Sequence, residues 1–268
     1  MQLPLVEGAP VVEREAERFR HVFRNACEFQ HFKNYLTGLI VLDKKSYAEI
    51  ARCLVGSADK TNISRFLSEA PWEEEPLSRE RVRWLLAETG PWQQPEKKSA
   101  LVFDDTLCEH VGSLFDHVDR HYDHTDNRYP LAHNLVTSHF VSGAVRFPVG
   151  WRLYRRYEEW TRWEKFVQKQ FPERTLPKQT KERNKFRKAV EPELLTAPEF
   201  AALHNSFRTK LTLAAQLLAE ALERDVPFSV VLMDGWYLAP DLVEALRAAE
   251  KDWISIVKRN RNVETQSF

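Results

Sequence analysis

The sequence lacks the features that mark secreted, membrane-spanning and disulfide-stabilised proteins. Its 268 residues include only three cysteines, Cys27, Cys53 and Cys108, which are odd in number and far apart. Such cysteines do not form a disulfide framework, so we expect a reducing compartment, the cytoplasm. The first residues are acidic and interrupted by proline, and no stretch of eighteen consecutive apolar residues occurs. We therefore predict neither a secretory signal nor a membrane-spanning helix.

Several common catalytic motifs are also missing. The sequence has no Gly-rich phosphate loop, no G-x-S-x-G and no H-E-x-x-H, so it does not point to the mechanisms that these motifs serve. Six of the nine histidines lie close together, near Cys108: His110, His117, His121, His124, His133 and His139. A zinc site is conceivable there, but the spacing matches no usual pairing of zinc ligands. We expect surface histidines or histidines near DNA.

The charges balance overall, with 39 basic and 39 acidic residues, but they are unevenly distributed. Between Trp151 and Val190 there are thirteen basic and five acidic residues. Such a segment suits either a phosphate backbone or a solvated, salt-bridged surface. Within it, Arg152, Arg155 and Arg156 are candidate DNA-binding residues. The interleaved Trp151, Trp160 and Trp163 can stack on bases, although ordinary core packing is the simpler interpretation.

The first third of the chain has helical patterns. Residues 13–89 are predicted to be helical, with Ser46 and Glu49 forming a capping box for a helix over 47–54. A turn over 56–59 and a second short helix over 62–67 complete the outline of a helix-turn-helix. Arg65 lies on the polar side of this second helix and is a candidate DNA contact. A linker rich in proline and charge, 90–98, leads us to predict a helical DNA-binding region over 1–95.

After the linker the pattern changes to strands. Apolar or β-branched runs over 100–103, 133–141 and 144–154 predict three strands, with Gly143 in a hairpin turn. A long helix follows over 200–218, begun by a capping box of Thr196 and Glu199. Next come a buried strand over 226–233, a helix over 240–249 and a strand over 253–257. Three antiparallel strands followed by alternating βα units predict an α/β domain with an RNase H-like mixed sheet over 96–268.

Carboxylates stand at the ends of two of these strands. Asp104 and Asp105 end the first strand and Asp234 ends the fourth. Aspartate is disfavoured in strands, and these two strand ends are neighbours in an RNase H-like sheet. Two carboxylates that converge there can hold Mg²⁺, which prefers oxygen ligands. The alternative is that all three aspartates are ordinary turn or cap residues.

The same residues resemble a known family. Phe103–Thr106, the stretch 133–140, Met233–Tyr237 and Ile256–Arg259 are similar to the bacterial insertion-sequence transposases of the DDE class. The segments 65–72 and 77–82 resemble the helices that precede the catalytic core in that family. The resemblance implies cleavage of DNA at an element's ends and transfer of the freed strand, with Mg²⁺ or Mn²⁺. It implies catalytic, metal-binding roles for Asp104, with Asp105 as the alternate, and for Asp234.

The resemblance also implies a third carboxylate, a glutamate on a helix after the fifth strand. Glu264 is the only glutamate after that strand, and it lies in a short polar tail, so we expect a transposase that is incomplete at its C-terminus. Lys258 and Arg259 are further candidate DNA contacts. The implied partners are double-stranded DNA, as terminal repeats and target, and other copies of the chain, acting at the nucleoid. Two alternatives stay open: a non-catalytic DNA-binding inhibitor of transposition, and a nuclease without strand transfer.

Overall fold

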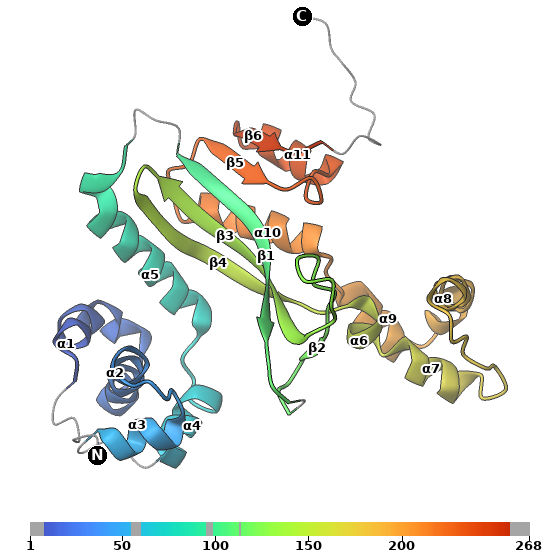
Figure 1. Cartoon of the computed structure of the whole chain (residues 1–268), viewed down its shortest axis with the longest axis horizontal. Coiled ribbons are helices and arrows are strands. Elements are labelled where there is room, and N and C mark those ends of the chain that lie inside the picture. Colours follow the sequence, from blue (N-terminus) through green and yellow to red (C-terminus); the bar gives the residue numbers. More distant parts are fainter. Residues whose placement is uncertain (1–7, 55–59, 95–98, 113, 258–268) are drawn as a thin grey trace, which may run out of the picture. The chain divides into compact units, whose positions relative to one another are not determined.

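The computed structural model describes residues 8–54, 60–94, 99–112 and 114–257 (Figure 1). The chain divides into two compact units, Met1–Pro91 and Trp92–Phe268. Within the described ranges, no helix combines the length and the apolar character needed to cross a membrane. The predicted DNA-binding role of the first unit stays a prediction.

The first unit is built from helices, as predicted for residues 13–89. They are α1 (Pro10–Ala16), the 3-10 helix η1 (Glu17–Val22), α2 (Ala26–Val41), α3 (Tyr47–Cys53), α4 (Lys60–Ser68) and α5 (Glu74–Thr89), with η2 (Gly90–Trp92) at the boundary between the units. Their core is dominated by aromatic rings, with the ring centres of Phe23 and Phe32 4.8 Å apart, the two rings tilted, and both side chains nearly inaccessible to solvent. These rings bury large apolar surfaces, which stabilise a small helical unit.

The pair α3 and α4 begins as the sequence predicts. The Ser46 hydroxyl accepts a hydrogen bond from the Glu49 amide at 3.3 Å and caps α3. The two helices pack through Ile50, Cys53 and Ile63. Gly38 of α2 lies against this pair, because an added Cβ would be 2.5 Å from Ile50. The predicted turn at 56–59 lies outside the described residues.

The second unit contains one mixed sheet, which confirms the predicted RNase H-like α/β fold. Its strands are β1 (Ala100–Glu109), β2 (Asp119–Arg120), β3 (Leu131–Ser142), β4 (Val145–Tyr154), β5 (Val230–Met233) and β6 (Asp252–Ser255). The order is β2-β3-β1-β5-β6, with β4 also paired to β3. β1, β3 and β4 are antiparallel, whereas β5 and β6 run parallel to β1. The parallel strands are joined through helices, as such connections require.

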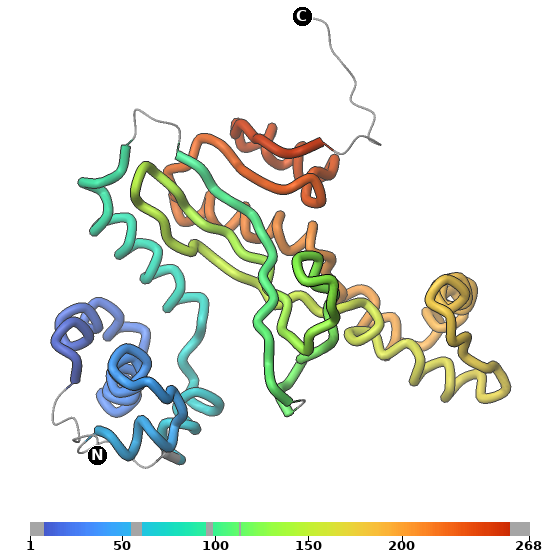
Figure 2. The backbone as a smooth tube through the Cα atoms, in the orientation of Figure 1, coloured from blue at the N-terminus to red at the C-terminus, as the bar shows by residue number. Residues whose placement is uncertain are grey.

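One face of this sheet forms the core. Alternate residues of β3 are buried, and α10 (Lys210–Glu223) packs on β3 and β4. The helix α11 (Pro240–Ala248) packs on α10 and on β6. The hairpin between β3 and β4 turns at Gly143, whose φ of 60° is a left-handed conformation that glycine adopts without strain (Figure 2).

Several predicted boundaries are wrong, and the strand predicted over 226–233 begins only at Val230. β1 does not end at Asp104 and Asp105 but continues to Glu109, because residues beyond them still pair with β3. The predicted long helix over 200–218 is two helices, α9 (Pro198–Ser206) and α10, since Phe207 is extended and Thr209 caps a new helix. The predicted capping box of Thr196 is also wrong, because its hydroxyl donates to the Glu193 carbonyl and Ala197 occupies the N-cap.

A helical cluster between β4 and α10 was not part of the predicted order. It consists of α6 (Tyr157–Thr161), α7 (Trp163–Gln170), α8 (Thr180–Leu194) and α9, drawn in yellow to orange in Figure 1. Trp163, Val167, Val190, Leu194 and Phe200 form its own buried core. The predicted core role of Trp163 is confirmed, whereas Trp151 on β4 is 44% exposed.

Candidate functional site

The candidate site lies where β1 and β5 run side by side. Phe103 is paired with Met233 in the parallel register, so Asp104 and Asp234 are the next residues along the two chains. Both paired residues are buried, Phe103 at 2% exposure and Met233 at 6%. Because these two side chains are packed in the core, the strands are held in place, and so are the backbone positions of Asp104 and Asp234.

Asp105 faces the helix-covered side of the sheet, the same side as the buried Phe103 two residues earlier. The Lys210 ammonium, at the start of α10, donates to the Asp105 carboxylate at 2.6 Å. The Tyr237 hydroxyl lies 3.5 Å from the other carboxylate oxygen of Asp105. The Lys210 ammonium also lies 5.2 Å from the ring centre of Tyr154 and 5.7 Å from that of Trp236. Asp105 is therefore held by a cation that is itself enclosed by two aromatic rings.

Asp234 shapes the turn that follows β5. One of its carboxylate oxygens accepts the backbone N–H of Trp236 at 2.8 Å and that of Tyr237 at 3.2 Å. This is the usual local bond of an aspartate to a backbone two or three residues ahead. The bond holds Tyr237 close to the strand end and leaves the second oxygen of Asp234 without a hydrogen bond in the described part of the chain.

Asp104 is exposed and makes local contacts. One of its carboxylate oxygens accepts the N–H of Asp105 at 2.8 Å, and its backbone carbonyl accepts from the Thr137 hydroxyl at 3.2 Å. Among the described residues no group donates to its other carboxylate oxygen. Asp104 and Asp234 therefore each present an oxygen that a ligand can use.

Tyr237 lies near all three aspartates. It is fully buried, and burial raises its pKa far above the ordinary value for a tyrosine. The negative charges of Asp105, Asp104 and Asp234 raise this pKa further, in that order. The hydroxyl therefore stays protonated and can donate to Asp105. We call the three aspartates around Tyr237 the carboxylate cluster.

The carboxylate cluster suits a hard cation better than zinc. Mg²⁺ is usually held by one or two carboxylates, with water and substrate phosphates as its other ligands. In the described ranges no group of three or more His, Cys, Asp or Glu side chains is arranged to hold a metal ion. The Lys210 ammonium already places one positive charge against Asp105. The oxygens of Asp104 and Asp234 that accept no hydrogen bond among the described residues are of the type that Mg²⁺ or Mn²⁺ takes as ligands.

The comparison with protein families decides the assignment. Residues 18–267 match the family described as DDE superfamily endonuclease. The chain belongs to this family. No curated protein matches the chain. The resemblance seen in the sequence is confirmed at the level of the DDE family, and the family supports an enzyme of the nuclease type that acts on DNA.

The arginines predicted to contact DNA in this DDE endonuclease are engaged within the chain. Arg152 forms an ion pair with Glu220 of α10. Arg155 donates to Glu159 at 2.8 Å and lies 4.8 Å from the ring centre of Trp160. Their DNA contacts stay predictions, because an arginine that would bind phosphate must first give up these partners.

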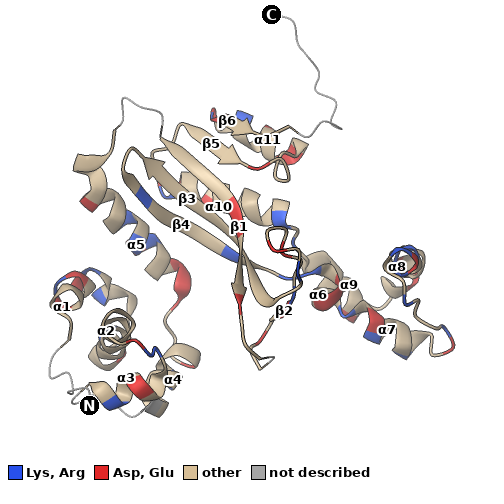
Figure 3. Ribbon diagram, in the orientation of Figure 1, with Lys and Arg blue, Asp and Glu red and all other residues tan. Residues whose placement is uncertain are grey.

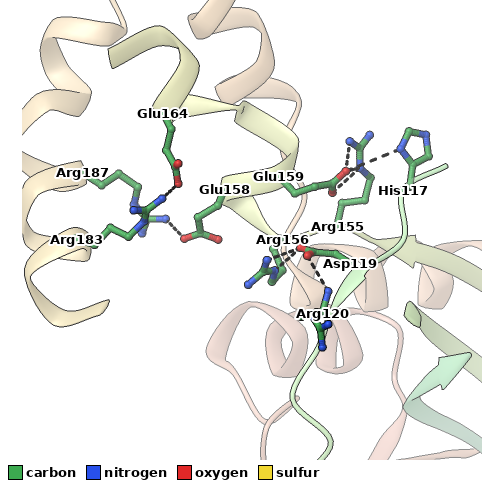
Figure 4. Close-up of polar contacts among 10 residues, drawn as sticks. All are labelled: His117, Asp119, Arg120, Arg155, Arg156, Glu158, Glu159, Glu164, Arg183 and Arg187. Carbon is green, nitrogen blue, oxygen red and sulfur yellow. Dashed lines mark hydrogen bonds and ion pairs between the residues drawn. The ribbon is translucent and has the colours of Figure 1, made fainter. Parts of the chain in front are cut away.

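The other predicted DNA contacts differ in their surroundings. Arg156 donates to Asp119 at 2.6 Å (Figure 4). Arg65 on α4 is 66% exposed and lies 3.5 Å from Glu69, a weak surface ion pair. Lys258 and Arg259 lie outside the described residues.

The histidine-rich segment contains a local hydrogen-bonded pair. The Nε2 atom of His110 lies 2.9 Å from the Nδ1 atom of His133, and the Nε2 atom of His133 lies 2.7 Å from the Asp116 carbonyl oxygen. His121 is buried, at 6% exposure, which contradicts a surface position for this residue.

Sequence reasoning missed two members of the site of this DDE endonuclease, Lys210 and Tyr237. Tyr237 belongs to the stretch Met233–Tyr237 that carried the resemblance, so its position was visible but its contact with Asp105 was not. Lys210 gave no signal, because it is 105 residues from Asp105 in the sequence. Trp236, in the same stretch, is 42% exposed beside Lys210.

Proposed function

We propose that this DDE endonuclease is a transposase that cleaves DNA at the ends of an insertion sequence and transfers the cut strand to target DNA. The observation that carries the proposal is that Asp104 and Asp234 directly follow the paired residues Phe103 and Met233 of two adjacent parallel strands, near Tyr237. We further propose that several copies act together on two DNA ends, at the bacterial nucleoid.

In this proposal Asp104 and Asp234 are the metal ligands and Asp105 is the alternate. When Mg²⁺ or Mn²⁺ is bound, it supplies activation of the attacking oxygen and stabilisation of the leaving oxygen in phosphodiester chemistry. The chain's own residues hold the ligands in place. The backbone N–H groups of Trp236 and Tyr237 orient Asp234, and Lys210 with Tyr237 fixes Asp105.

The first test is nicking of supercoiled plasmid in the presence of Mn²⁺. Asp104→Asn and Asp234→Asn are expected to reduce nicking at least about 100-fold, because even the outer partners of metal ligands are worth roughly 10–100-fold. Asp225→Asn is the matched control, since Asp225 is exposed and its φ of 53° is one that asparagine also adopts. It is expected to nick at the wild-type rate.

A comparison of Asp104→Asn with Asp105→Asn separates the two candidates on β1. Loss of nicking in Asp105→Asn alone would move the metal-binding role from Asp104 to Asp105. Nicking that survives in Asp234→Asn would refute the proposed site. Nicking without transfer of a labelled DNA end would support a nuclease in place of a transposase.

The second candidate function is a DNA-binding protein that occupies the element ends without cutting them. The observation that favours it is that, among the described residues, no three His, Cys, Asp or Glu side chains are arranged to hold a metal ion together. Duplex binding without nicking by the wild-type protein in Mn²⁺ would support this candidate.

A further inference from the structure

The basic residues of α8 are divided between two opposite faces of the helix. Arg183 forms an ion pair with Glu164, and Arg187 forms one with Glu158 (Figure 4). The Arg187 guanidinium also lies 4.6 Å from the ring centre of Tyr157. These arginines are on the inner face of α8, because they precede the buried Val190 by seven and three residues. Their ion pairs therefore join α8 to α7 and α6 within the helical cluster.

The lysines of α8 point the other way. Lys181, Lys185 and Lys188 are all exposed, and their spacing of four and three residues places them on one side of the helix. Figure 3 colours the lysines and arginines of α8 blue. In the described part of the chain none of them forms an ion pair or a hydrogen bond through its side chain. Glu182 precedes Lys185 by three residues and Glu191 follows Lys188 by three, but in the described part of the chain neither acid forms an ion pair with these lysines, and Glu191 accepts from the Tyr157 hydroxyl. We call these three lysines the lysine face.

An ordinary solvated helix surface does not need this arrangement. Like charges four and three residues apart repel one another, and helices usually relieve the repulsion with acidic residues at those spacings. The arginines of α8 are held in ion pairs with glutamates, whereas the lysines of the lysine face form none among the described residues, although Glu182 and Glu191 stand at such spacings. A lysine ammonium on a flexible stem suits a phosphate as a point charge. From Lys181 to Lys188 the helix rises about 10 Å, which equals the rise of about three base-pair steps of duplex DNA.

We propose that the lysine face of α8 binds the phosphate backbone of duplex DNA without reading its sequence. The binding surface is separate from the carboxylate cluster and is supplied by the helical cluster inserted between β4 and α10. This inference rests on the proposed function, because that function makes DNA the ligand. It assigns the DNA contact of the basic segment 151–190 to Lys181, Lys185 and Lys188 rather than to its paired arginines.

The test is the salt dependence of binding to a labelled linear duplex by the full chain. Each phosphate contact contributes about 0.9 to the slope of log K against log salt. Lys185→Gln/Lys188→Gln is therefore expected to lower the slope by about 1.8 and to weaken binding about 60-fold at roughly 0.1 M salt. Lys185→Arg/Lys188→Arg keeps the charges and is expected to bind like the wild type.

The matched control is Arg146→Gln/Arg247→Gln. It removes two positive charges from exposed positions on β4 and α11 of the same unit, and the slope is expected to change little. If the lysine variant and this control have the same slope, the lysine face is not the binding surface.

The outcomes also separate this inference from the proposed function. A lower slope in the lysine variant, together with wild-type protein that binds but does not nick, supports the lysine face and refutes the catalytic proposal. Absence of duplex binding by the wild type overturns both. Thermal melting of the lysine variant checks its folding, and it is expected to match the wild type because both side chains are exposed.

Discussion

Lys210→Met tests whether the ion pair between Lys210 and Asp105 holds the carboxylate cluster together. The substitution keeps the length and the apolar stem of the side chain and removes only the ammonium. The ammonium and the carboxylate are 2.6 Å apart, with the Lys210 side chain 16% exposed and that of Asp105 32% exposed. Removing the ammonium leaves the carboxylate partly buried, with the Tyr237 hydroxyl as its remaining side-chain partner in the described part of the chain.

The size of the effect follows from this intermediate burial. Exposed pairs contribute roughly 0.2–1 kcal/mol, and breaking a fully buried pair costs roughly 3–5 kcal/mol. For the Lys210–Asp105 pair we expect a coupling of about 1–2 kcal/mol. In a domain of roughly 150–250 residues, 1 kcal/mol shifts Tm by about 2–4 °C, so Lys210→Met is expected to lower Tm by about 2–8 °C.

The assay is a double-mutant cycle by thermal or urea unfolding without metal. It uses the wild type, Lys210→Met, Asp105→Asn and the double variant, whose two side chains no longer carry opposite charges. The double variant is expected to be more stable than the sum of the two single losses predicts. If the coupling is below about 0.3 kcal/mol, which is the scatter of independent sites, the two residues do not stabilise each other and the reasoning is wrong.

Three further changes test the fold. Burial lowers the pKa of His121, and the charges of Arg156 and Lys210 add to this effect. Just below about pH 6.5 the folded state therefore binds fewer protons than the unfolded state, so stability falls there as pH falls. The Tm of His121→Gln should fall less than that of the wild type between about pH 7.5 and pH 5.5. Thr209→Ala removes the cap of α10 and should cost about 1 kcal/mol in urea unfolding, whereas an unchanged midpoint would mean that water replaces the cap. Gly38→Ala brings a Cβ to within 2.5 Å of Ile50 and should cost about 1–3 kcal/mol in the first unit's transition.

The order of the strands can be predicted from the sequence, because burial of one or both faces of a strand requires apolar residues at regular spacing. Alternating burial in β3 and continuous apolar residues in β5 are direct consequences of one covered face and of two covered faces. In this pattern of apolar residues Asp104, Asp105 and Asp234 stand out, since carboxylates interrupt or follow the apolar runs. Their neighbourhood could therefore be predicted once the strand order was known.

Other features leave no such record. Phe207 continues the helical spacing of Phe200 and Leu211, so periodicity hides the break that its extended backbone creates. β1 continues past Asp105 because its backbone pairs with β3, and backbone pairing does not depend on apolar side chains. The contact of Lys210 with Asp105 depends on where α10 begins, which the sequence pattern placed wrongly.

The helical cluster has a buried core of its own, so mutations in this cluster need not affect the carboxylate cluster. The helices between the end of β4 at Tyr154 and the start of α10 at Lys210 share a core of Trp163, Val190, Phe200 and their neighbours. The carboxylate cluster lies on β1 and after β5, and among the described residues its hydrogen bonds come from Lys210, Trp236 and Tyr237 rather than from that core. If the lysine face binds DNA as proposed, mutations on the outer surface of α8 change the affinity for DNA without changing the carboxylate cluster. Selection could then act on DNA affinity and on cleavage independently.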